Sequence, residues 1–314
     1  MKFFITGIGS DIAQVTARII REEFPTATIV GADIHDMHAG HFFCDEVLFS
    51  QQANSIQFVD WLTETIHLKE IDIYIPLSEA ELRVLSRLDE LPKVISQVII
   101  WAGKLCATKC LDKLETFDFL EENNIPVPWT KAAADYIDMD FPCIYKMRES
   151  AGSKNIFVCN NDKEAAFLKS LHGNNGIFQE LLTPSLNEIT CPVYLDNNNI
   201  VHVLQLQRKL AGGLTGWCKS ISNDEIDSLC RSVALLLRPE CPINIQLILT
   251  EQGPRIFEIN PRISSTALIR DKMGFADVRW MINAKLGISQ LINSHVPTGI
   301  IGYKLTDAEI CYEK

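Results

Sequence analysis

The chain has 314 residues, of which 47% are hydrophobic and 22% charged, so it can form two or three globular domains or subdomains. Its net charge of −11 and the absence of a basic stripe argue against a nucleic-acid-binding protein. No apolar run is long enough to span a membrane, and the opening run is too short for a signal peptide. The 10 scattered cysteines lack metal-ligand spacing, which indicates reduced thiols and a cytoplasmic protein.

Residues 1–105 are expected to form an α/β domain, because strand and helix patterns alternate there. Such alternation favours a parallel sheet with helices on both faces. The expected strands are residues 2–6, 28–33, 45–50, 71–77 and 98–103, and the expected helices are residues 11–24, 55–70 and 79–88.

The remainder is expected to be an α+β body, which we divide into residues 106–178 and 179–314. Helices are predicted from residue 111 up to a proline-rich stretch and at residues 162–171 and 224–237. Antiparallel strands are predicted at residues 141–146, 156–159, 176–182, 188–196 and 199–209, before a final hairpin.

The hairpin spans Asn244–Arg262 and holds the most informative motif of the chain. Side chains two apart on a strand point the same way, so Glu258 and Asn260 should share a face. Pro261 should end the strand and leave Arg262 just beyond it. A carboxylate, an amide oxygen and a guanidinium together suit magnesium bound to a polyphosphate. The alternative is an ordinary solvent-facing hairpin strand.

A glycine turn follows the first strand. Gly7 and Gly9 precede a helix, and Asp33 ends the next strand, as in dinucleotide-binding domains. Ile12 occupies the position of the third glycine, so an NAD(P)-dependent oxidoreductase is the weaker interpretation. We favour a tight strand-to-helix turn with Asp11 near the helix cap.

Two lysines and a small-residue loop suggest phosphate binding. Lys113 begins a helix, and Lys146 ends a strand that leads into the flexible residues 148–155. Backbone N–H groups of such a loop can fold over phosphates. The loop lacks the G-K-[ST] sequence of a Walker site. The alternative for either lysine is a solvated surface charge.

A short apolar segment, Phe178–Leu182, is followed by Glu188. Backbone N–H and C=O groups of such a segment can bond an adenine edge, and a carboxylate beyond it can accept the hydroxyl groups of a ribose. The alternative for Glu188 is an exposed strand glutamate.

Taken in order, these motifs resemble the ATP-grasp superfamily, particularly proteins similar to the carbamoyl-phosphate synthase large subunit and the carboxylate–amine ligases. The resemblance covers nearly the whole chain. It implies a Rossmann-like pre-ATP-grasp domain that does not bind NAD, followed by an α+β ATP-grasp fold of two subdomains. The quoted segments DKLETFDFLEENNIPVP, FPCIYK, QELL, NIQL and FEINPR carry it.

The resemblance also implies roles for individual residues. The ATP contacts would be Lys113, Lys146 and Ser153 at the phosphates, Glu180, Leu181 and Leu182 at the adenine, and Glu188 at the ribose, with Glu180 and Leu182 acting mainly through their backbone. Gln246, Glu258 and Asn260 would bind Mg²⁺, or Mn²⁺ in its place. Arg262 would clamp the transferred phosphate, and Arg208 would face the same space.

The implied activity is ADP-forming ligation of a small-molecule carboxylate to an amine through an acyl-phosphate, by a protein that could be a homodimer. A non-catalytic nucleotide-binding relative is the main alternative. Residues 210–220 could form a loop at the substrate, and Ser264–Thr266 with Arg270 could bind the acceptor carboxylate. For these last two segments, a glycine-rich turn and a helix cap are equally good interpretations.

Overall fold

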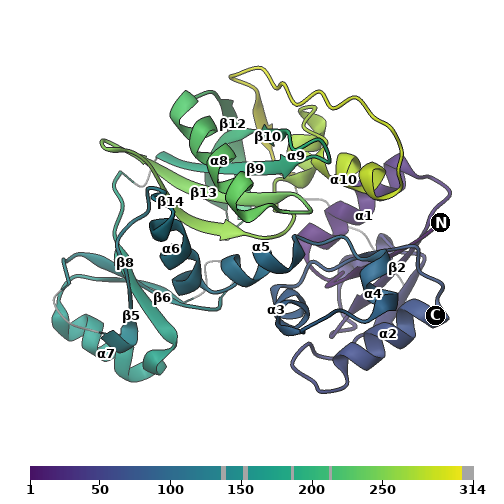
Figure 1. The fold of residues 1–314 in the computed structure, drawn as a ribbon, viewed down its shortest axis with the longest axis horizontal. Coiled ribbons are helices and arrows are strands. Elements are labelled where there is room, and N and C mark those ends of the chain that lie inside the picture. Colours follow the sequence, from purple (N-terminus) through teal and green to yellow (C-terminus); the bar gives the residue numbers. More distant parts are fainter. Residues whose placement is uncertain (136–138, 151–154, 185–186, 212–213, 306–314) are drawn as a thin grey trace.

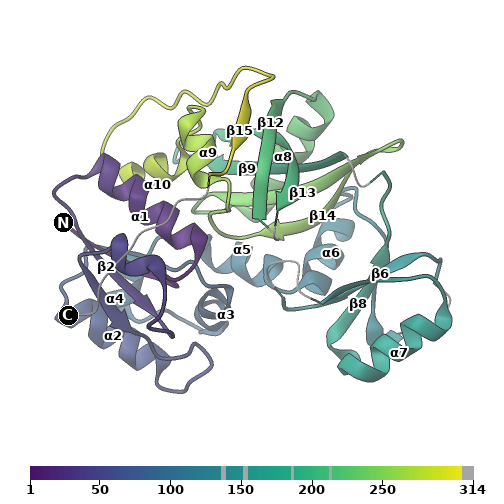
Figure 2. The same cartoon turned by 180° about the vertical axis from the view of Figure 1, so that it is seen from behind.

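The computed structural model describes residues 1–135, 139–150, 155–184, 187–211 and 214–305. These residues form three sheets, each with its own helices (Figure 1). The N-terminal sheet and the large C-terminal sheet lie side by side, whereas the middle sheet forms a lobe at one end of the molecule (Figure 2). This arrangement agrees with the expected α/β domain followed by an α+β body.

The N-terminal sheet is parallel, with strand order β3-β2-β1-β4. Its strands β1 and β2 are almost wholly buried, as expected when helices cover both faces. The expected strand at residues 98–103 is not formed: helix α4 ends at Val98, and only Ile99 makes a single bridge, to Tyr74. The elements are β1 (Lys2–Thr6), α1 (Asp11–Glu23), β2 (Thr28–Asp33), η1 (Ala39–Phe42), β3 (Glu46–Phe49), α2 (Phe58–Leu68), β4 (Ile73–Ile75), α3 (Glu79–Arg87) and α4 (Lys93–Val98).

The middle sheet is antiparallel, with strand order β5-β8-β6-β7, and it has a hydrophobic core of its own. Strand β8 runs past residue 178 to Glu180, so this lobe extends slightly beyond the expected boundary. The elements are β5 (Thr130–Ala132), η2 (Ala133–Asp135), β6 (Cys143–Met147), β7 (Ile156–Cys159), α7 (Asp162–His172), η3 (Gly173–Asn175) and β8 (Gly176–Glu180).

The third sheet has strand order β14-β13-β9-β11-β12-β15, with β10 paired to β9. The single strand expected at residues 199–209 is two strands that both pair with β9 and are separated at Leu204, whose N–H donates to the carbonyl of Pro192 at 3.1 Å. The elements are β9 (Glu188–Leu195), β10 (Val201–Val203), β11 (Gln205–Ala211), β12 (Leu214–Ile221), α8 (Asp224–Leu237), β13 (Ile243–Thr250), β14 (Gly253–Asn260), α9 (Ala267–Lys272), α10 (Asp277–Lys285) and β15 (Ile301–Tyr303).

Helices α5 (Gly103–Cys110) and α6 (Lys113–Glu122) join the three parts. Helix α5 crosses the expected boundary at residue 105 and packs against α3, α6 and α8. One hydrophobic core contains both Ile5 of the first sheet and Ile245 of the third, so these two parts are packed as one body. The residues of these two parts that face one another are therefore held in fixed relative positions.

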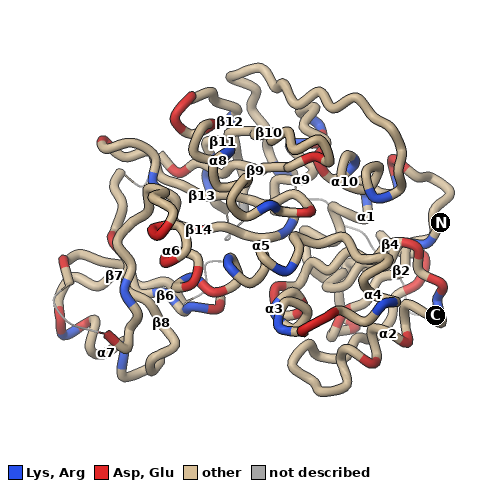
Figure 3. Tube along the Cα trace, viewed as in Figure 1, with Lys and Arg blue, Asp and Glu red and all other residues tan. Residues whose placement is uncertain are grey.

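Acidic and basic residues are interspersed along the described trace (Figure 3). Within the described residues, no helix is both long and apolar enough to cross a membrane. The nine described cysteines are free thiols, and eight of them are buried.

Candidate functional site

A cavity of about 240 Å³ lies between the middle and third sheets. It gathers most of the residues that the sequence singled out, from both sheets and from the start of α6. Its lining includes Lys113, Lys146, Ser150, Gln179, Glu180, Leu181, Leu182, Glu188, Arg208, Gln246, Phe257 and Glu258.

Lys146 is the buried cation of this cavity. It lies near the end of β6 with only 5% of its surface exposed, and its Nζ donates to Gln179 Oε1 at 2.7 Å. The ammonium also lies over the Phe257 ring, 5.3 Å from its centroid. Burial lowers the pKa of Lys146 to about 8, although the Glu258 carboxylate partly opposes this shift. No carboxylate of the described residues comes within ion-pair distance, so the site lacks a paired anion.

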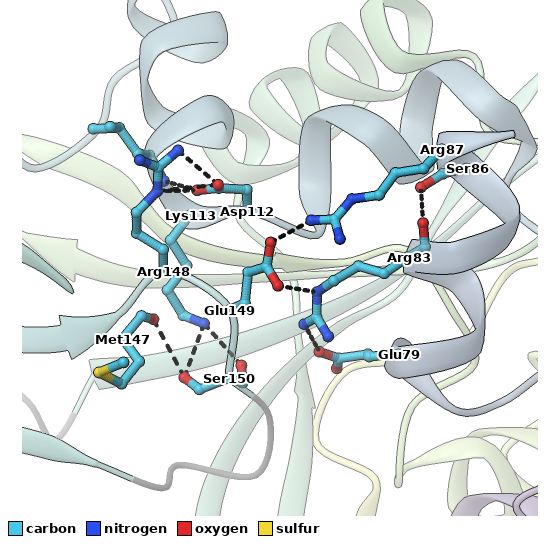
Figure 4. Close-up of polar contacts among 11 residues, drawn as sticks. Glu79, Arg83, Ser86, Arg87, Asp112, Lys113, Met147, Arg148, Glu149 and Ser150 are labelled. Atoms are coloured by element: carbon cyan, nitrogen blue, oxygen red, sulfur yellow. Dashed lines mark hydrogen bonds and ion pairs between the residues drawn. The ribbon is translucent and has the colours of Figure 1, made fainter. Parts of the chain in front are cut away.

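Lys113 is held beside the end of β6 (Figure 4). Its Nζ donates to the Ser150 carbonyl at 2.8 Å and to Ser150 Oγ at 3.3 Å. Asp112 caps α6 by accepting from the Leu114 N–H at 3.0 Å, and it receives a bidentate contact from Arg148. This contact raises the pKa of Arg148. Ser153, the other expected phosphate residue, lies outside the described residues.

The segment expected at the adenine follows β8. Leu181 and Leu182 line the cavity, and Leu182 is buried. The Glu180 N–H already donates to the Trp129 carbonyl at 2.9 Å, because β8 pairs with the chain leading into β5. The Leu182 N–H bonds no described residue, so it is the donor that a ligand edge could use. The Glu180 carboxylate accepts from the Trp129 N–H at 3.2 Å.

Glu188, Arg208 and Gln246 form one hydrogen-bonded group across strands β9, β11 and β13. Arg208 donates from Nε to Glu188 Oε1 at 2.8 Å, and from Nη2 to Gln246 Oε1 at 2.8 Å. Arg208 Nη2 also contacts Glu188 Oε1. Glu188 Oε2 accepts from no described residue and stays available for a hydroxyl group. Arg208 thus lies in the cavity as expected, whereas the Gln246 oxygen is already engaged.

The expected hairpin is present as β13 and β14, which pair in antiparallel register. Gln246 lies opposite Glu258 and Asn244 opposite Asn260, and β14 ends at Asn260 before Pro261. The described residues contain no cluster of three or more His, Cys, Asp or Glu able to hold a metal. Magnesium usually needs only one or two carboxylates when phosphates supply further oxygens, so Glu258 and Asn260 suit a nucleotide-bound ion.

Arg262 turns away from the cavity toward helix α3. Its Nε and Nη2 donate to Glu79 Oε1 at 3.2 and 2.7 Å, and both side chains are nearly buried. Glu79 lines a small neighbouring pocket with Lys113, Glu258 and Asn260. Sequence reasoning missed Glu79, because no spacing or motif relates the start of α3 to the hairpin.

A family model for the ATP-grasp domain matches residues 110–266, half of the chain. This chain belongs to the ATP-grasp family. The resemblance seen in the sequence is therefore confirmed, and the match covers Lys113 and Lys146, residues 178–188 and the hairpin of β13 and β14. A search of curated proteins found no match.

Solved structures share the fold of this ATP-grasp protein. The ADP complex of N5-carboxyaminoimidazole ribonucleotide synthetase (PurK) has 14% identity and a TM-score of 0.76, over 96% of this chain and 80% of its own. The Staphylococcus aureus N5-carboxyaminoimidazole synthetase with ADP has 13% identity and a TM-score of 0.74, over 94% of this chain and 79% of its own. The biotin carboxylase domain of Hydrogenobacter thermophilus 2-oxoglutarate carboxylase, solved with MgADP and bicarbonate, has 13% identity and a TM-score of 0.73. The match covers 96% of this chain and 73% of that domain's chain.

The N-terminal turn of this ATP-grasp chain matches the favoured interpretation rather than a dinucleotide site. Gly7 adopts a φ of +68°, and Ser10, not Asp11, caps α1 by accepting from the Ala13 N–H. Asp33 Oδ2 accepts from the Gly9 N–H at 2.9 Å, so this carboxylate holds the turn. It is therefore engaged where a ribose-binding acid would need to be free.

For the two weaker substrate assignments, the described residues agree better with the structural alternatives. The described part of residues 210–220 belongs to strands β11 and β12 rather than to a loop. Arg270 is 1% exposed and donates to Asp277, Ser264 and Thr266, so it has no surface for an acceptor carboxylate. Burial together with these hydrogen-bonded partners makes it a core group.

Proposed function

We propose that this protein is an ATP-dependent, ADP-forming ligase that activates a small-molecule carboxylate and couples it to an amine. One observation carries the proposal: two lysines without carboxylate partners among the described residues meet Glu258 at one cavity. A buried cation and a half-buried one, both without paired anions, favour an anionic ligand, and a neighbouring carboxylate favours one that brings a metal ion.

The cavity offers each part of ATP a matching group. Lys113 and Lys146 would bind the phosphates, and the Leu182 N–H and the apolar chain beside it would bind the adenine. Glu188 Oε2 would accept a ribose hydroxyl while Oε1 stays with Arg208. Ser153 remains a predicted phosphate contact. The ADP-bound structures of the same fold make a nucleotide at this place a reasonable expectation.

Glu258 and Asn260 would hold Mg²⁺ or Mn²⁺ on the phosphates, with Gln246 beside them. The ion would neutralise charge that develops on the phosphate oxygens. Glu258 contributes anionic oxygen and Asn260 neutral oxygen from one strand face. Both lie on a paired strand of the main body, which fixes their separation.

The reaction would proceed in two steps. A carboxylate oxygen attacks the γ-phosphorus, and the bond to the β-phosphate oxygen breaks to give an acyl-phosphate and ADP. An amine then attacks the acyl carbon, loses a proton and releases phosphate. Lys146, Arg208 and Arg262 would stabilise charge on the transferred group, so positioning and electrostatics carry the chemistry.

The pairing of Arg262 with Glu79 gives the alternative function a specific basis. A protein that never released Arg262 would bind nucleotide without transferring phosphate. We favour the ligase because the lysines, Glu258 and Asn260 are all present. We further propose that it acts in the cytoplasm on free small molecules, without nucleic-acid or membrane partners, and could assemble as a homodimer.

The deciding experiment measures ADP and phosphate release with Mg-ATP against a panel of carboxylates, bicarbonate included, with and without amines. Turnover that requires one acid and one amine would establish the ligase. Thermal protection by ATP without turnover would favour the non-catalytic alternative. Protection by NAD(P) but not by ATP would contradict both.

A further inference from the structure

We propose that Arg83 of helix α3 is a positioning residue that links the first domain to two phosphate-binding elements of the ATP-grasp site. It lies between Glu79, which holds Arg262, and Glu149, which adjoins Ser150 at the end of β6 (Figure 4). The inference rests on the proposed function, because Arg83 would act on the binding of ATP. Arg83 itself lines neither of the two site pockets described above.

The first part of this series of ion pairs holds Glu149 in place. Glu149 Oε2 lies 3.3 Å from Arg83 Nε, and Glu149 Oε1 accepts from Arg87 Nη2 at 2.6 Å. Arg83 is only 16% exposed, whereas Arg87 is 67% exposed. Water screens an exposed ion pair strongly, so Arg83 should contribute more than Arg87 to holding Glu149, despite its longer contact.

Glu149 stands directly before Ser150, whose carbonyl and hydroxyl oxygens receive the Lys113 ammonium. Arg148, on its other side, is fixed to Asp112 at the start of α6. Helix α3 and helix α6 therefore hold three consecutive residues from two directions. A shift of Glu149 would move the Ser150 oxygens that set the position of Lys113.

The second part of this series of ion pairs connects Arg83 to Arg262 through Glu79. Arg83 Nη2 lies 3.6 Å from Glu79 Oε2, while Glu79 Oε1 accepts from Arg262. Arg83 and Arg262 thus share one carboxylate that is 11% exposed, each at its own oxygen. A phosphate that attracts Arg262 would leave Glu79 to Arg83, so Arg83 lowers the electrostatic cost of releasing Arg262.

The geometry around Arg83 suits such an exchange. Its Nε is buried but makes no aligned hydrogen bond to any described residue, so the approach to Glu149 is an ion pair without a fixed direction. Removal of Arg83 would leave Glu79 less neutralised near the phosphates, and it would release Glu149 and with it the Ser150 oxygens that position Lys113. ATP should then bind more weakly, and Arg262 should be held more tightly by Glu79.

The test measures Mg-ATP affinity by calorimetry, and KM for ATP and kcat where turnover is found, in four forms of the full chain. Arg83→Gln should weaken Mg-ATP binding about three- to thirtyfold, the range seen for residues that couple sites through a network. Arg87→Gln is the matched control and should change affinity less than about twofold. Arg83→Lys keeps the charge and should restore most of the affinity, which a purely structural role of the guanidinium would not allow.

Glu149→Gln provides a second route if Arg83→Gln folds poorly, and it should also weaken Mg-ATP binding. Its effect should not add fully to that of Arg83→Gln, because the two variants remove one interaction. Equal affinity in wild type and all variants would overturn the positioning role alone. A wild-type protein that binds no Mg-ATP would instead overturn the proposed function on which it rests.

Discussion

Glu79 and Arg262 are 183 residues apart in the sequence, yet their side chains form a nearly buried ion pair at the junction of the first domain and the end of the β13–β14 hairpin. The pair places a carboxylate from the first domain in the same small pocket as Glu258 and Asn260. It also occupies the guanidinium that should meet the transferred phosphate. The first domain therefore affects the charge at the catalytic end of the site directly.

Glu79→Gln should tighten Mg-ATP binding about two- to fivefold, because it removes a negative charge near the phosphates and frees Arg262. Calorimetric titration of the full chain measures this. Glu64→Gln, on the exposed face of α2, is the control with the same change in net charge and should leave affinity unchanged. Weaker binding in Glu79→Gln would show that Glu79 itself contributes to the nucleotide site.

Mg-ATP binding should weaken as pH rises above about 8. The pKa of Lys146 is lowered to about 8 from 10.5, so its ammonium is present below that pH and is lost as pH rises through it. The dissociation constant should increase by at most about tenfold per pH unit, the limit for one proton. Because bound phosphate favours the charged form, the pKa of Lys146 should be higher in the complex, so the rise should begin near pH 8 and level off only above that higher pKa.

Lys146→Met is the comparison for this pH effect, since methionine occupies similar space without a titratable group. It should bind Mg-ATP more weakly at pH 7 and show a much flatter dependence between pH 7 and 9.5. If Lys146→Met retained the wild-type slope, another group would be responsible for the pH dependence, and the phosphate role of Lys146 would lose its main support.

Glu258→Gln should abolish magnesium-dependent ATP turnover, with a loss of about 10²-fold or more, as when one charge-stabilising group is removed. Its melting temperature should remain close to that of wild type, because Glu258 is half-buried and makes no ion pair with any described residue. Glu251→Gln, in the exposed turn of the same hairpin, is the matched control. Undiminished turnover in Glu258→Gln would contradict the metal assignment.

The local parts of this site could be predicted from sequence, because they depend on spacing within one strand or one turn. Glu258 and Asn260 share a face for the same reason that β14 alternates, and Pro261 ends the strand by lacking a donor. The contacts of Arg262 with Glu79 and of Arg208 with Gln246 depend on how separate elements pack. No periodicity within either element encodes such contacts.

Apolar pattern alone also misplaced some elements. The run ending the first domain was expected as a strand because it is as apolar as its neighbours, but only Ile99 reaches the sheet. In that run burial, rather than strand pairing, accounts for the hydrophobic residues, and short apolar runs do not distinguish the two. Residues 199–209 have strand composition throughout and do pair with β9, but as the two strands β10 and β11, which meet at Leu204.

Arg270→Met should destabilise the protein by about 3–5 kcal/mol, because it leaves the Asp277 carboxylate buried without its partner. Burial already raises the pKa of Asp277, which indicates how poorly its surroundings tolerate an unpaired charge. Denaturant unfolding measures the loss. The double variant Arg270→Met, Asp277→Leu should recover much of it, because two apolar side chains need no compensation.

The same variants test whether Arg270 has any part in substrate binding. In conditions where Arg270→Met and the double variant remain folded, their Mg-ATP affinity and their KM for the acid should equal those of wild type, since Arg270 contacts neither the cavity nor Glu258. A raised KM for the acid in a fully folded double variant would return Arg270 to the acceptor site. A loss confined to unfolding free energy would fix its role as a core ion pair with Asp277.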